Sequence, residues 1–120
     1  MRKVNAMYKG HYDDVERIPQ TKYGTTGTDM RVLIDKSKGA PVFAMRLISI
    51  QADGHIGMHD HLWEHEIFVL RGAGLAKCGD ESAEMNPGDF LLIPPDVPHG
   101  FDNTGDDVLE FICCIPIMNH

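Results

Sequence analysis

Four histidines in two separated groups are the residues of this chain best suited to carry out chemistry. The first group places three imidazoles close together, at His59, His61 and His65, and the second is a single ring at His99. A neutral imidazole offers a nitrogen lone pair near physiological pH, and it is the commonest metal ligand in proteins. Because burying four unpaired imidazoles in one place would be costly, this set predicts a mononuclear metal centre.

β-Strand geometry explains how these side chains can meet. Residues i and i+2 of a strand point to the same face, so His59 and His61 can project together. A bend over residues 62–64 can bring His65 back beside them, and His99 opens a second β-like segment. The remaining histidines are interpreted as ordinary core or surface residues: His11, His55 and His120.

The rest of the chain predicts an all-β fold. Its 12 Gly and 7 Pro in 120 residues favour short strands and tight turns over a helix bundle. The strands are expected at 31–34, 42–50, 55–61, 65–70, 75–78, 82–85, 90–93, 99–103 and 108–117. Such a succession is typical of a sandwich or barrel. We expect residues 1–28 to form a polar N-terminal arm and residues 29–120 to form the barrel.

Both histidine groups lie in motifs that resemble those of the cupin family. The first motif comprises Gly54, which stands one residue closer than usual, His59-Asp60-His61 and Gly72. The second comprises Gly88, Pro94, Asp96 in place of a glycine, His99 and Asn103. The resemblance covers residues 40–117 and implies a double-stranded β-helix, the jelly-roll barrel of the cupins.

The acid position of the first motif is where this chain departs from the family pattern. Glu66 follows His65 directly, and both spacings occur in the family, so either residue can be the ligand. The string HxHxWEHEIFVLxG is similar to that of small single-domain cupins whose site is all histidine. The resemblance therefore implies His59, His61, His65 and His99 as ligands, with Glu66 as the runner-up. The expected cofactor is one divalent transition metal per subunit: Mn, Fe, Ni, Zn or Cu.

A metal held only by neutral imidazoles keeps most of its positive charge. In octahedral geometry it also keeps two open positions, so it could polarise a substrate, activate water or bring O₂ to a chelating substrate. Strand alternation suggests a mostly apolar substrate pocket, with plain core packing as the alternative for each of its members. The expected pocket residues are Phe43, Met45, Phe101, Phe111 and Cys113.

We therefore expect a metal-dependent enzyme acting on a small organic molecule, with dioxygenase-type oxidoreductase chemistry as the first family reaction. A metal-dependent isomerase or lyase and a non-catalytic small-molecule or metal-binding module are the alternatives. No nucleophile–base signature stands out, so no catalytic residue is assigned. Because ligation requires neutral imidazoles, metal occupancy is expected to fall as the pH drops through about 6.

Charge and composition restrict the partners. A net charge of −7 argues against nucleic acid, and no apolar run is long enough for a membrane helix. Three cysteines, of which Cys113 and Cys114 are adjacent, favour a reducing cytoplasm over a disulfide framework. Residues 42–50 are apolar at both odd and even positions, except at Arg46 and Ser49. Both faces of this strand should therefore pack against other parts of the protein or a partner. A symmetric homodimer that includes the N-terminal arm is the expected cover.

Overall fold

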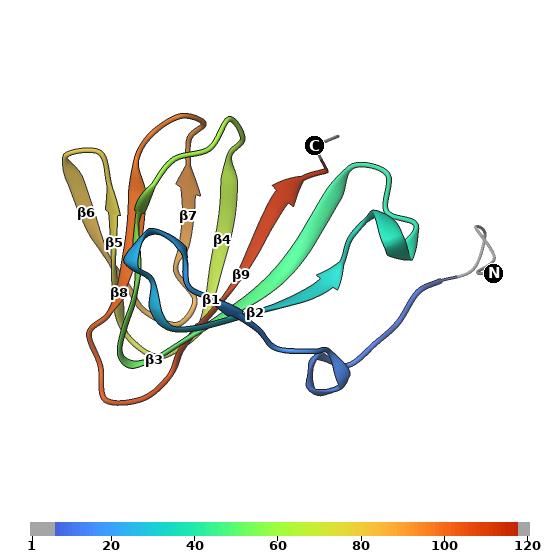
Figure 1. Ribbon diagram of the computed structural model, residues 1–120, viewed down its shortest axis with the longest axis horizontal. Helices are drawn as coiled ribbons and strands as arrows, with labels where there is room; N and C mark the ends of the chain where they lie inside the picture. The colour runs from blue at the N-terminus through green and yellow to red at the C-terminus, as the bar shows by residue number, and fades with distance from the viewer. Residues whose placement is uncertain (1–6, 118–120) are drawn as a thin grey trace.

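The computed structural model describes residues 7–117, which form nine strands and three short 3₁₀-helices (Figure 1). In chain order the elements are η1 (Tyr12–Asp14), β1 (Ile18–Gln20), η2 (Lys22–Gly24), β2 (Thr26–Ile34), η3 (Lys36–Lys38), β3 (Phe43–His59), β4 (His65–Arg71), β5 (Gly74–Cys78), β6 (Glu81–Met85), β7 (Phe90–Ile93), β8 (His99–Asn103) and β9 (Leu109–Pro116). The expected all-β class and the cupin jelly-roll architecture are confirmed. Within residues 7–117, no helix is long and apolar enough to cross a membrane.

One curled sheet contains all of these strands. Its main path runs β6-β5-β8-β3-β9-β4-β7, while β2 also pairs with β3 and β1 pairs with β2. The long strand β3 joins the two halves, because residues 43–50 pair with β9 and residues 55–59 pair with β8. Between these stretches the strand bends at Asp53, which has a φ of 67°. Figure 1 shows the resulting shape, in which β5, β6 and β8 face the half of the sheet that holds β4 and β9.

Strand alternation places the histidines and the apolar core in the same interior. The buried residues of β4 alternate and are His65, Ile67 and Val69, and the buried residues of β8 are His99, Gly100, Phe101 and Asn103. Further along the interior, Phe111 and Leu109 of β9 are 1% and 0% exposed. Burying a side chain of this size contributes about 1.5–3 kcal/mol. The core therefore supports one end of the barrel interior, and the imidazoles lie at the other.

The N-terminal segment packs against its own barrel. β1 pairs with β2, and the boundary between arm and barrel that was expected at residue 28 falls inside β2. Residues 1–6 of the expected arm and residues 118–120 of the expected barrel lie outside the described residues. Farther upstream, the guanidinium of Arg31 lies 5.1 Å from the ring centre of Tyr12. Residues 18–20 and 26–34 thus belong to the sheet.

A close approach of backbones holds η2 against β3. Tyr23 has a φ of 61°, and a Cβ on Gly57 would overlap the Tyr23 carbonyl oxygen. Gly57 also donates its N–H to the Thr25 hydroxyl at 3.1 Å. The strained backbone of Tyr23 is therefore kept in place by a contact that only glycine permits on the facing strand.

Candidate metal centre

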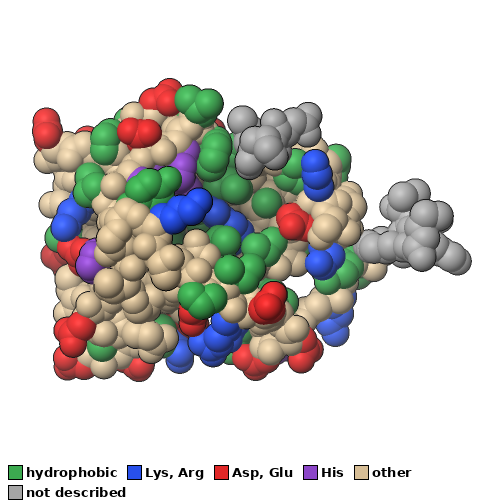
Figure 2. All heavy atoms as spheres, viewed as in Figure 1, with side chains coloured by type: hydrophobic (Ala, Val, Ile, Leu, Met, Phe, Trp, Pro, Cys, Tyr) green, Lys and Arg blue, Asp and Glu red, His purple; other side chains and the backbone are tan. Residues whose placement is uncertain are grey.

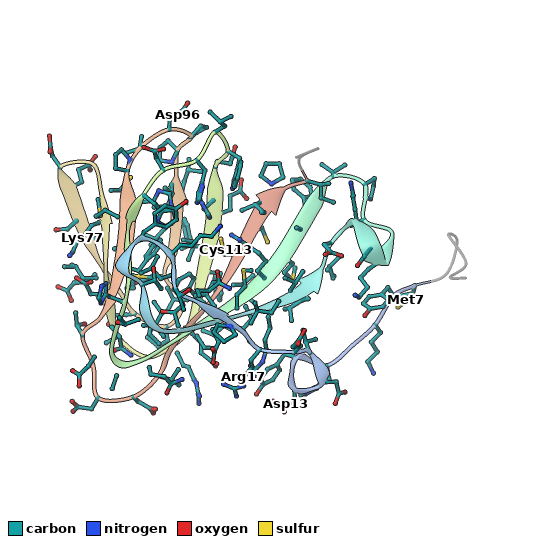
Figure 3. All side chains as sticks on the ribbon, in the orientation of Figure 1. Met7, Asp13, Arg17, Lys77, Asp96 and Cys113 are labelled. Atoms are coloured by element: carbon teal, nitrogen blue, oxygen red, sulfur yellow. The ribbon has the colours of Figure 1, made fainter. Side chains whose placement is uncertain are left out.

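Three strands and one loop bring the four histidines to the same end of the barrel. His59 ends β3 and His99 opens β8, and the two are direct partners in the β3–β8 pairing. His65 opens β4, and His61 lies in the loop between β3 and β4. The N–H of Asp96 fixes this loop by donating to the His61 carbonyl at 2.7 Å. Figure 3 shows Asp96 at the top of the barrel, above the interior in which Cys113 lies.

The four imidazole rings converge. The candidate ligand nitrogens of His59, His61 and His99 all lie within 4.8 Å of one another, so these three residues could hold a metal ion. The ring of His65 is adjacent, with its centre 5.1 Å from that of His61 and 4.9 Å from that of His99. The structure thus brings together all four histidines singled out by the sequence.

Backbone carbonyls set the tautomer of two rings. Nδ1 of His59 lies 2.7 Å from the Gly57 carbonyl, and Nδ1 of His99 lies 2.9 Å from the Val97 carbonyl. A carbonyl oxygen only accepts, so each Nδ1 carries the proton and each Nε2 keeps its lone pair. This is the arrangement that orients metal-ligating histidines in proteins.

His65 is oriented by a side chain instead. Its Nδ1 lies 3.0 Å from Sγ of Cys113 and 3.4 Å from Nη2 of Arg46. Burial raises the pKa of the Cys113 thiol, although the Arg46 guanidinium acts against this shift. The Nε2 atoms of His65 and His99 are both buried without a hydrogen-bond partner. Buried nitrogens are normally paired, so these two unpaired nitrogens fit a metal ion.

The surroundings of His61, His65 and His99 favour their neutral form. Burial, together with the neighbouring His59 and His99, lowers the pKa of His61 to about 4. Burial and the Arg46 guanidinium lower the pKa of His65 to about 3, and burial also lowers the pKa of His99. Neutral imidazoles are the form that binds a metal, so these rings are available as ligands at neutral pH.

The runner-up ligand lies on the other face of the sheet. Glu66 is exposed, and in the strand pairing it stands between Leu92 of β7 and Cys114 of β9. His65, the preceding residue, is buried. Because neighbouring residues of a strand point to opposite faces, Glu66 lies outside the group of histidines.

A cavity of ≈ 330 Å³ adjoins the imidazoles. Phe101, Phe111 and Cys113 line it, as the sequence suggested. The expectation for Phe43 and Met45 needs correction, because they lie on the outer face of β3 and are 66% and 36% exposed. Residues 42–50 are apolar on both parities, so the pattern alone could not tell the inner face from the outer one.

The cavity also has walls that the sequence did not reveal. The Trp63 ring stacks on His61 at 4.6 Å, and the Tyr23 ring stacks on His59 at 4.8 Å, both with an interplanar angle of 4°. Arg46 lines the cavity from β3. Its signal was a lone charge inside an apolar strand, whereas Tyr23 had no local signal. Figure 2 shows histidine side chains in a hollow beside Lys or Arg side chains.

Comparison with known proteins agrees with this architecture. Residues 46–115, more than half of the chain, match the cupin domain family. The chain belongs to the cupin family. Among solved structures, this cupin is similar to the polyketide cyclase RemF from Streptomyces resistomycificus, with a TM-score of 0.87 and 31% identity. That similarity covers 94% of this chain and 81% of RemF.

Two further relatives match at the level of sequence. The oxalate-binding protein of Thermotoga maritima is 27% identical over 107 residues, which cover 86% of this cupin and 87% of that protein. An uncharacterized protein of Methanocaldococcus jannaschii is 38% identical over 58 residues, or 48% of this cupin. The matched region is 46% of that protein, so this cupin spans less than half of its length.

The lowered pKa values of the histidines predict how the stability of the metal-free protein depends on pH. In the unfolded chain these histidines become protonated as the pH falls below the ordinary pKa of 6.5. In the folded protein His61 and His65 stay neutral down to their lowered pKa values of about 4 and about 3. The contribution of these histidines to the free energy of unfolding should therefore be greatest above pH 6.5 and should decline steadily as the pH falls toward 3. Urea unfolding at a series of pH values measures this, and His65→Gln should flatten the slope. An identical slope in that variant would contradict the assignment.

Proposed function

We propose that this cupin is a metal-dependent enzyme that holds one divalent transition metal, Mn, Fe, Ni, Zn or Cu, and acts on a small oxygenated organic molecule. The observation that carries the proposal is the pair of buried, unpaired Nε2 atoms on His65 and His99 beside the rings of His59 and His61. When bound, the metal would supply Lewis acidity toward a substrate oxygen. The chain itself would position that oxygen and exclude water.

The walls of the cavity support a flat, conjugated substrate. The side chains of Tyr23, Trp63, Phe101 and Phe111 line the cavity, and apolar rings of this kind bind the face of a planar molecule. A cavity of ≈ 330 Å³ suits a small organic molecule. The similarity to a polyketide cyclase supports non-redox chemistry on an enolisable carbonyl compound, such as a cyclisation, as the first candidate reaction.

Dioxygenase-type chemistry is the second candidate. It is supported by a ligand set that contains no carboxylate and would leave two positions of an octahedral ion open. Oxygen uptake separates the two candidates. Protein loaded with Fe, Mn, Ni or Cu and mixed with β-diketone or aromatic-diol substrates should convert the diketone without consuming O₂ if the first candidate is right. Stoichiometric O₂ consumption that depends on the substrate would instead establish the oxygenase.

The metal content of single-residue variants tests the proposed ligands. Elemental analysis of the purified wild type should find about one transition metal per chain. His65→Ala should lower this content at least tenfold, because it removes one of the four nitrogens. Glu66→Ala, the matched control from the adjacent exposed position, should leave the content unchanged. The reverse order of the two variants would transfer the fourth ligand to the carboxylate, and a wild type that binds no metal would refute the proposal.

The neutral rings also revise the pH at which the metal is released. The pKa values of His61 and His65, about 4 and about 3, lie well below the ordinary value of 6.5. Protons therefore compete less strongly with the metal than the sequence suggested. In the same elemental analysis, occupancy should fall at a lower pH than the value of about 6 that the sequence suggested.

We further propose a homodimer formed through the outer face of β3, β9, β4 and β7. Exposed apolar side chains on this face are Phe43, Met45, Phe68, Phe90 and Leu92. Phe90 is 81% exposed beside a groove of ≈ 370 Å³. A projecting ring and a groove on one surface suit a two-fold partner, because each ring can enter the groove of the other copy.

Light scattering tests this assembly. The wild type should be a dimer at micromolar concentration, and Phe90→Glu should make it a monomer because the charge cannot enter an apolar groove. Since Phe90 lies outside the histidine cavity, the variant should retain its metal. A monomeric wild type would contradict the proposed dimer and leave the metal centre untouched.

A further inference from the structure

The Lys and Arg side chains that line the histidine cavity have no acidic counterpart in its lining. Eighteen residues line it, and among them Arg46 and Lys22 are cations while no Asp or Glu is present. The acidic side chains that give the chain a net charge of −7 all belong to the described residues 7–117 and lie outside this cavity lining. A bound divalent metal would add further positive charge to the same cavity.

Arg46 has only weak, uncharged hydrogen-bond acceptors. Its Nη2 donates to Sγ of Cys113 at 3.1 Å, and its Nη1 donates to Sδ of Met30 at 3.6 Å. Its Nε is buried and has no partner. Sulfur is a poor acceptor, and a charge removed from water without a counter-ion is costly.

Other arginines of the chain show what is missing at Arg46. Arg71 lies 3.1 Å from a carboxylate oxygen of Glu110, and Arg17 lies 3.6 Å from one of Asp29. Within residues 7–117, no carboxylate forms such a pair with Arg46. Arg46 is thus more enclosed than these two arginines and lacks the anion that each of them has. Arg31 is also buried and forms no ion pair within residues 7–117, but its guanidinium lies over the Tyr12 ring.

Metal ligation by His65 would leave the Arg46 guanidinium with still fewer hydrogen-bond acceptors. If Nε2 of His65 binds the metal, its Nδ1 must carry a proton, so Arg46 cannot donate to it across their 3.4 Å separation. Three of the five guanidinium N–H groups then have no acceptor, since Cys113 and Met30 take one each. A fork of free N–H groups matches the two oxygens of a carboxylate.

We propose that the cavity is built for an organic anion, a carboxylate or an enolate, and that Arg46 is the residue that selects it. The proposal rests on the proposed function, because it names the substrate class of the same site. The anion would supply the charge that the ligand set lacks. Lys22, exposed at the edge of the cavity, adds a second positive charge along the way in.

Calorimetric titration with benzoate and its neutral counterpart benzamide tests the proposal. Both probes are planar and of the same size, so they differ in the charge that Arg46 would recognise. Zinc-loaded wild type should bind benzoate more tightly than benzamide. Arg46→Gln should weaken benzoate binding by about 10- to 100-fold, the usual range for a lost charged hydrogen bond, and leave benzamide binding unchanged.

Two further variants serve as controls. Arg46→Lys keeps the charge but not the fork, so its benzoate affinity should be intermediate. Arg71→Gln makes the same change in net charge at an exposed site and should bind benzoate like the wild type. Thermal unfolding of the metal-free Arg46→Gln protein should show a midpoint equal to or above that of the wild type, because the variant loses an uncompensated charge.

The outcomes separate this proposal from the metal centre. Equal benzoate binding by wild type and Arg46→Gln, or no benzoate binding by either, would overturn the anion site even if elemental analysis finds a full complement of metal. Conversely, a wild type without metal that still binds benzoate through Arg46 would support the anion site and refute the proposed function.

Discussion

Two short hydrogen bonds, from Nδ1 of His59 and Nδ1 of His99 to backbone carbonyls two residues earlier, are the constraint on which the rest of the site depends. Each bond fixes a tautomer and turns an Nε2 lone pair away from the backbone. Because His59 and His99 are cross-strand partners in the β3–β8 pairing, fixing the register of that pair also fixes the separation of the two rings. The candidate metal site is therefore largely a consequence of the sheet: Gly57 of β3 orients His59, and Val97, two residues before β8, orients His99.

Burial gives the site its chemical character. Removing imidazoles from water favours their neutral form, and the lowered pKa values of His61 and His65 express that effect. The Arg46 guanidinium acts in the same direction on His65, since a nearby cation disfavours a second one. The same arrangement leaves a cavity whose lining has excess positive charge and no carboxylate. A substrate that brings its own negative charge would resolve the imbalance, which a neutral substrate would leave in place.

The sequence predicted the class of fold, most strand positions and the four converging histidines, because these follow from short-range rules. Alternation along 99–103 and 65–69 specifies one buried face, and the turn residues mark the strand ends. It failed for Phe43 and Met45, since a strand that is apolar on both parities carries no signal for its inner face. It also divided β3 at residues 52–54, where the strand instead bends and changes partner. Arg46 had a local signal, the lone charge in an apolar strand, but its place in the cavity depends on tertiary contacts, and Tyr23 had no local signal at all.

Part of the cavity wall comes from residues that precede the region matched by the cupin family. The cupin family match begins at residue 46, yet four residues that line the cavity, Gln20, Lys22, Tyr23 and Thr25, precede it by more than twenty positions. They are held there by the β1–β2 pairing and by the close approach of Gly57 to Tyr23. The histidines and the metal they could hold come from the shared barrel, whereas this N-terminal wall is a separate addition to it. Changes in the wall can alter the shape of the cavity without removing an imidazole, because Tyr23 contacts the candidate metal centre by stacking on His59.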